Sequence, residues 1–88
     1  GLRVFVLQNR AGAEVDLIIE PPRGGIVAVE VKSSKDPRPA DFQAGFEALA
    51  EIVKPRRTIC VSCAPYPRKT GGTEILPWRE YFQLLAGL

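Results

Sequence analysis

The sequence predicts a single α/β domain, and three observations support this prediction. The chain has 88 residues, which is enough for one domain, so we expect a single unit spanning residues 1–88. Short runs rich in β-branched residues alternate with two segments of helical periodicity. Apolar residues make up 45% of the chain and charged residues 25%, a balance typical of a folded protein rather than a disordered one.

Three strands are expected in the first third of the chain. Residues 3–8 and 13–20 are rich in β-branched and aromatic side chains, with turn residues between them. Residues 26–32 give the strongest strand signal, because this run is almost continuously apolar. Such a run is typical of a central strand that is buried on both faces. The Pro- and Gly-rich segment 21–25 predicts a turn before it.

The rest of the chain predicts two helices and one or two strands. Residues 39–53 form an amphipathic helix with Phe42, Phe46, Leu49 and Val53 on one face. Residues 57–63 are a buried strand, residues 64–72 a loop and residues 73–76 a short strand. A last helix starts at Pro77-Trp78. The expected order is β-β-β-α-β-(β)-α.

On that last helix, the spacing of Trp78, Tyr81 and Phe82 favours packing in the core. Stacking of these rings on nucleic-acid bases is the alternative.

Composition limits the classes of function. The chain has no His, which excludes His-based catalysis and the common zinc sites that contain His. The net charge of +2 permits a polyanionic partner without implying one. No segment resembles a membrane span or a signal peptide. The reduced thiols expected below suit a cytoplasmic location. The chain has no Met and begins at Gly1, so we expect a piece of a longer protein.

The two cysteines, Cys60 and Cys63, form a Cys-x-x-Cys motif. A redox or zinc role needs both sulfurs together, and zinc needs further ligands. Because the motif lies on a predicted strand, its sulfurs are expected on opposite faces. We therefore expect two buried, reduced thiols.

Charge also occurs where burial is expected. On the strand 26–32, Glu30 and Lys32 share a face with Ile26 and Ala28. If the strand pairs with 13–20 without a bulge, residue i faces residue 46 − i. Asp16 then faces Glu30, and Glu14 faces Lys32. Two facing carboxylates repel, so a cation between them is expected, either Lys32 or a metal ion.

This arrangement suits phosphodiester hydrolysis. Asp16 and Glu30, with the backbone carbonyl of Val31, offer oxygen ligands to Mg²⁺ or Mn²⁺. The metal lowers the pKa of a bound water, and Lys32 orients that water or neutralises developing charge. Glu14 is a further ligand or a partner of Lys32. A structural ion cluster is the alternative, and the charge pattern alone does not decide between the two.

The segments Gly12–Glu20 and Val29–Ser34 resemble the second and third strands of the PD-(D/E)XK nuclease superfamily. The chain as a whole is most similar to a domain of unknown function that follows the ATPase module of bacterial and archaeal AAA-type ATPases, including its C-terminal Pro-Trp helix. The resemblance implies a restriction-endonuclease-like mixed sheet that lacks the N-terminal helix of the superfamily. It assigns metal binding to Asp16 and Glu30 and catalysis to Lys32. Gln43 falls where some relatives carry a Gln, and is a weaker candidate.

The resemblance implies a metal-dependent nuclease domain that acts on DNA, with an ATPase module upstream. The alternatives are a non-catalytic DNA-binding or protein-docking module and an oligomerisation domain, since an exposed edge strand favours homo-oligomers. Four basic residues could grip a phosphate backbone or be solvated loop charges; they are Lys35, Arg38, Arg68 and Lys69.

Overall fold

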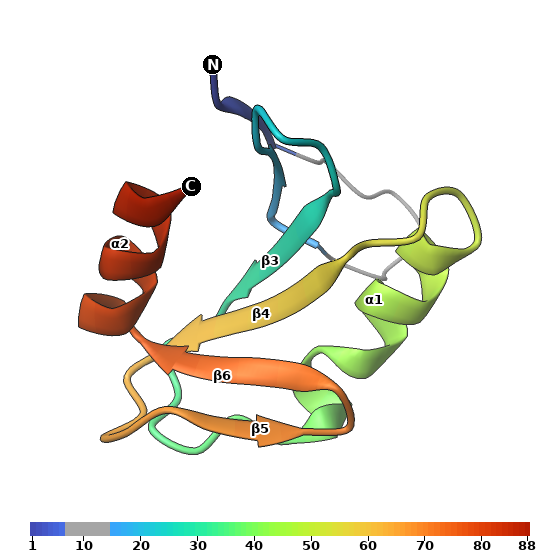
Figure 1. The fold of residues 1–88 in the computed structure, drawn as a ribbon. Helices are drawn as coiled ribbons and strands as arrows, with labels where there is room; N and C mark the ends of the chain where they lie inside the picture. The colour runs from blue at the N-terminus through green and yellow to red at the C-terminus, as the bar shows by residue number, and fades with distance from the viewer. Residues whose placement is uncertain (7–14) are drawn as a thin grey trace.

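A computed structural model describes residues 1–6 and 15–88 and shows a mixed six-stranded sheet with a helix on each face (Figure 1). The strand order is β1-β2-β3-β4-β6-β5. Strands β3, β4 and β6 are parallel, and the others pair antiparallel. The elements are β1 (Arg3–Val6), β2 (Leu17–Glu20), β3 (Val27–Val31), the 3-10 turn η1 (Pro39–Asp41), α1 (Gln43–Ala50), β4 (Arg57–Ser62), β5 (Arg68–Thr70), β6 (Thr73–Pro77) and α2 (Trp78–Gly87).

Alternation along the strands divides the core into two layers, one on each face of the sheet. The layer under α1 contains Phe42, Phe46 and Leu49 of the helix, packed on sheet residues such as Ala28 and Cys60. The layer under α2 contains Tyr81 and sheet residues that include Val29, Ile59 and Val61. The central position predicted for strand 26–32 is confirmed, because β3 pairs with β2 on one side and with β4 on the other.

The helical face predicted for residues 39–53 is confirmed, with different boundaries. Phe42, Phe46 and Leu49 are buried, and Val53 packs against them. The α-helix itself is shorter than predicted, running from Gln43 to Ala50. The 3-10 turn η1 precedes it and begins at Pro39, which has no N–H to donate and therefore suits a first helical turn.

The loop predicted for residues 64–72 is wrong in its second half, where β5 forms. Thr70 pairs with Thr73 across a two-residue turn, Gly71-Gly72, and both glycines have positive φ. Glycine adopts such φ values at little steric cost, and two-residue hairpin turns require them. The three residues of β5 are polar, so no apolar alternation announced the strand.

The core packing predicted for the aromatic residues of the last helix is correct only for Tyr81, which is buried. Trp78 and Phe82 are exposed, and their ring centroids lie 5.8 Å apart. The buried stripe of α2 instead continues from Tyr81 through the partly buried Leu84, Leu85 and Leu88. Across residues 1–6 and 15–88, neither helix has the length and apolarity that a bilayer span needs.

A bidentate ion pair joins β4 to β6. Arg57 donates from Nε and Nη2 to the two carboxylate oxygens of Glu74, at 2.8 and 2.6 Å. These hydrogen bonds are the main reason that the pKa of Glu74 lies below its ordinary value. The pair spans two parallel strands that are far apart in sequence, so it stabilises the sheet where local contacts cannot.

The stabilisation from Glu74 should therefore depend on pH. Because folding lowers its pKa, the contribution is present above the unfolded value and is lost as pH falls through the folded one. We expect Glu74→Gln to lower the free energy of unfolding by about 1 kcal/mol at neutral pH and by much less near pH 3. Urea unfolding of both proteins at the two pH values measures this, and an equal difference at both would contradict it.

Candidate functional site

Glu30 is a buried carboxylate on the central strand. Only 1% of the residue is exposed, and it lies next to the last residue of β3. Its Oε1 lies 3.3 Å from Nζ of Lys32, whose side chain is 34% exposed. Because β3, β4 and β6 are parallel, their carboxyl ends meet at one edge of the sheet, which is where open α/β sheets bind ligands. Glu30 and Lys32 therefore lie where a ligand-binding site is expected in a sheet of this kind.

Asp16 lies directly before β2 and contacts the same end of β3. Leu17 pairs with Val29 and Ile19 with Val27, the 46 − i register that the sequence predicts. Continued by one residue, this register places Asp16 level with Glu30. Asp16 Oδ2 accepts a 2.7 Å hydrogen bond from the N–H of Val31. Since the N–H and C=O of a strand residue point to the same side, the carbonyl of Val31 is also directed toward β2.

These groups fit a hard divalent cation. Mg²⁺ is commonly held by one or two carboxylates and completes its shell with water and substrate oxygens. Glu30, the half-buried Asp16 and the carbonyl of Val31 are oxygen donors on two adjacent strands. Within the described residues, no three His, Cys, Asp or Glu side chains cluster as a metal-binding group. Glu14, predicted as an extra ligand, lies outside those residues.

Cys60 lies beside Glu30 in the register of β3 and β4. Burial is the main cause that raises the pKa of the Cys60 thiol to about 11, and the charge of Glu30 adds to it. The prediction of two buried thiols is wrong for Cys63, which is exposed because it follows the end of β4. Both cysteines are free.

The two thiols should therefore differ sharply in reactivity. At pH 8 we expect Cys63 to react with Ellman's reagent in the folded protein, and Cys60 to react only after unfolding, since the thiolate is the nucleophile. Absorbance at saturation should give one thiol before denaturant and two after it. Cys63→Ser should abolish the native reaction, and a fast-reacting thiol in that variant would contradict the expectation.

Gln43 lies at an exposed position of α1, where its amide donates a 2.9 Å hydrogen bond to Glu47. It lines a groove of about 490 Å³ between α1 and the β5–β6 turn. The floor of this groove includes Thr58 and Thr73, whose hydroxyl groups lie 2.9 Å apart. The groove contains none of Asp16, Glu30 and Lys32.

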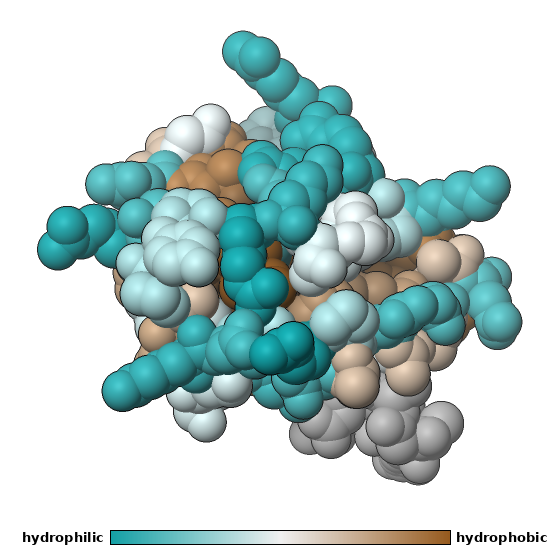
Figure 2. All heavy atoms as spheres, turned by 90° about the horizontal axis from the view of Figure 1, so that it is seen from below, coloured by the Kyte–Doolittle hydropathy of each residue, from teal (hydrophilic) through white to brown (hydrophobic). Residues whose placement is uncertain are grey.

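The loop after β3 carries a polar network that the sequence did not predict. Asp36 forms ion pairs with Arg38 and Arg68, each at 2.8 Å, and so joins this loop to β5. Seen from below, where this loop and β5 lie in Figure 1, the surface is mostly hydrophilic, with smaller hydrophobic areas between the polar side chains (Figure 2). The sequence contains Arg68 and Asp36 as ordinary loop charges, and only the pairing of β5 with β6 brings them together.

Two comparisons find no relative, and one identifies a family. A model of a domain of unknown function, DUF4143, matches residues 1–81. No curated protein and no solved structure shows a significant match to the chain. The matched range includes Asp16, Glu30, Lys32 and the Asp36 network.

Proposed function

We propose that this chain, which belongs to the DUF4143 family, is a metal-dependent phosphodiesterase domain acting on DNA. The observation that carries the proposal is Glu30, a carboxylate buried on the central strand, with Lys32 at 3.3 Å and Asp16 level with it just before β2. A buried charge is costly unless its site compensates it, and such costs concentrate at functional sites. The mixed sheet and the order of its first strands agree with a restriction-endonuclease-like fold.

Each residue has a distinct role in this proposal. Asp16, Glu30 and the Val31 carbonyl hold Mg²⁺ or Mn²⁺, which supplies charge stabilisation and an acidic bound water. The hydrogen bond from the Val31 N–H fixes the Asp16 carboxylate, so the ligand is oriented before substrate binds. Lys32 is partly exposed, so its ammonium can face the scissile phosphate and neutralise charge that develops there.

Metal binding and strand cleavage test the proposal together. Calorimetry with Mg²⁺ and Mn²⁺ should show binding that Asp16→Ala weakens, and plasmid nicking should require the same residue. Glu51→Ala is the matched control, because Glu51 is an exposed carboxylate at the end of α1. A folded protein that neither binds metal nor nicks DNA would rule out catalysis.

A docking or oligomerisation module is the second candidate, and exposed apolar side chains favour it. All four residues of β1 are exposed, including Val4 at 53% and Val6 at 74%, and β1 forms one edge of the sheet. Trp78 and Phe82 expose an aromatic pair on α2. A strand edge of this kind can pair with a second copy. Such a module would bind its partner and leave DNA uncut.

The parent protein in this proposal is an ATPase. DUF4143 domains are commonly found with AAA ATPases, and an ATPase module upstream would move or position the DNA that this domain cuts. The same proposal places the protein in the cytoplasm, where DNA and Mg²⁺ are both accessible. Co-purification of a longer chain with ATP-dependent nicking activity would support it, and nicking unaffected by ATP would count against it.

A further inference from the structure

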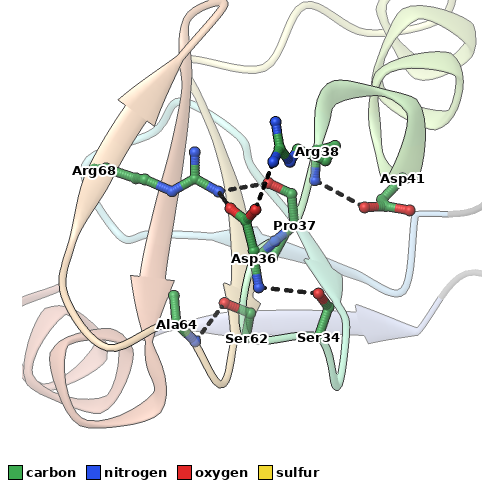
Figure 3. A network of polar contacts seen from close by, with 8 residues as sticks. All are labelled: Ser34, Asp36, Pro37, Arg38, Asp41, Ser62, Ala64 and Arg68. Carbon is green, nitrogen blue, oxygen red and sulfur yellow. Dashed lines mark hydrogen bonds and ion pairs between the residues drawn. The ribbon is translucent and has the colours of Figure 1, made fainter.

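Two arginines converge on the carboxylate of Asp36, in the loop after β3. In Figure 3, Asp36 lies between the guanidinium groups of Arg38 and Arg68. Asp36 Oδ2 lies 2.8 Å from Nη2 of Arg38, and Asp36 Oδ1 accepts a 2.8 Å hydrogen bond from Nη2 of Arg68. One arginine comes from the loop after β3 and the other from β5, so the fold, rather than sequence proximity, creates the pair.

The two guanidinium groups keep donors for another anion. Arg68 also donates from Nη2 to the carbonyl of Pro37, at 2.6 Å. In the contacts formed within residues 1–6 and 15–88, each arginine therefore uses only Nη2. A guanidinium group has five N–H donors in a planar fork, so the Nε and Nη1 hydrogens remain. Departure of Asp36 also releases Nη2 of Arg38, and the Nε and Nη2 edge of a guanidinium matches two oxygens of a phosphate.

Asp36 is easy to displace. Its side chain is 58% exposed and that of Arg38 is 73% exposed, so water and salt weaken their attraction. Arg68 is more enclosed, at 31%, and the Pro37 carbonyl keeps its guanidinium in place when the carboxylate leaves. Arg68 is thus already in position for another anion, and the carboxylate of Asp36 that contacts both arginines is weakly bound.

The loop that contains Asp36 and Arg38 follows β3 directly, so it starts at the strand end next to Glu30. The thiol of Cys60, which pairs with Glu30 in the sheet, is influenced by the charges of Glu30, Lys32 and Arg68 together. Ser34 O, two residues before Asp36, accepts a 3.1 Å hydrogen bond from the N–H of Cys63 and so ties the loop to the end of β4. The loop with the arginine pair is therefore anchored at the carboxyl ends of β3 and β4.

We propose that Arg38 and Arg68 bind a backbone phosphate of the DNA strand at the Glu30 site, and that Asp36 occupies the pair in the free protein. DNA binding displaces Asp36, so this residue acts as an internal competitor that lowers affinity. This inference rests on the proposed function, because it takes DNA as the ligand. The exposed Lys35 on the same loop adds positive charge beside the phosphate.

Fluorescence anisotropy with a labelled DNA duplex, in EDTA and at several salt concentrations, tests the proposal. Asp36→Asn removes the competing charge and should tighten binding several-fold. Arg38→Ala and Arg68→Ala should each weaken binding and reduce the salt slope of log K by about one. Arg23→Ala is the matched control, since Arg23 is exposed in the turn before β3, at the opposite end of that strand. It should leave the slope unchanged.

The outcomes separate this inference from the proposed function. Asp36→Asn binding no tighter than the natural protein, with both arginine variants behaving like Arg23→Ala, would overturn the inference. Glu30-dependent nicking would leave the proposed function standing in that case. Arginine-dependent binding without nicking would support the inference and remove catalysis. Inorganic phosphate competing as well as DNA at equal phosphate concentration would overturn the assignment to nucleic acid. Because Arg38 is exposed, its variant should fold even where Arg68→Ala does not.

Discussion

Glu30→Met is expected to abolish metal-dependent nicking while leaving the domain at least as stable as the natural protein. Nicking should fall by about 100-fold or more, the scale on which a single electrostatic stabiliser of a transition state acts. Stability should hold because Glu30 is only 1% exposed, and replacing a buried charged group with a well-packed apolar side chain of similar volume is often neutral or stabilising by about 1–4 kcal/mol. Lys32, at 34% exposed, can turn its ammonium to water once Glu30 is gone.

This test needs the activity and the stability of the same protein preparation. Plasmid nicking measures the activity, and urea unfolding measures the free energy of unfolding. Glu47→Met is the matched control, because Glu47 is exposed on α1. Loss of about 3–5 kcal/mol in Glu30→Met, the cost of breaking a buried pair that the fold depends on, would show that Glu30 is structural. Unchanged nicking would contradict its assignment as a metal ligand.

Of the substitutions considered in this protein, Ile59→Ala is expected to lower the free energy of unfolding most. Ile59 is fully buried, pairs with Val29 of β3 and packs in the layer under α2. Removing its branched side chain leaves a cavity between β4 and α2 and should lower the free energy of unfolding by about 2–5 kcal/mol. A domain of this size has roughly 5–15 kcal/mol in total, so much of the stability disappears.

Urea unfolding at neutral pH measures this loss as a lower midpoint with an unchanged slope. Ile52→Ala is the same chemical change at a position that is 82% exposed, and it should alter stability by no more than about 0.5 kcal/mol. Equal effects of the two substitutions would show that burial in the layer under α2 does not determine stability here.

The order of most elements could be predicted from the sequence, because the spacing of apolar residues reflects which faces of strands and helices are buried. The run 26–32 predicted a central strand, and the spacing of Phe42, Phe46 and Leu49 predicted the buried face of α1. β5 could not be predicted this way, since its three polar residues depend on pairing with β6. The Gly71-Gly72 dipeptide was its one local signal. On α2, Trp78 and Tyr81 differ in burial because the helix presents a narrower stripe than its aromatic residues suggest.

The geometry of the candidate site followed from one assumption, an unbulged hairpin with a symmetric turn. That assumption is correct for the three pairs between β2 and β3, and it leads to Asp16 beside Val31. The Asp36 network escaped prediction because it joins residues 32 positions apart, Asp36 and Arg68. Such contacts depend on tertiary structure and leave no periodic trace in the sequence.

The length of the turn between β2 and β3 matters more for the candidate site than for the packing of the core. Leu17, Ile18 and Ile19 are all apolar, so these three positions of β2 could exchange faces without placing a polar side chain in either layer of the core. The length of the turn, with positive φ at Gly24 and Gly25, sets the register that aligns Asp16 with Glu30. Relatives with one residue more or fewer in this turn should therefore fold normally but lack the proposed nuclease activity. Loop length, more than residue identity, would then distinguish active family members from those retained as scaffolds.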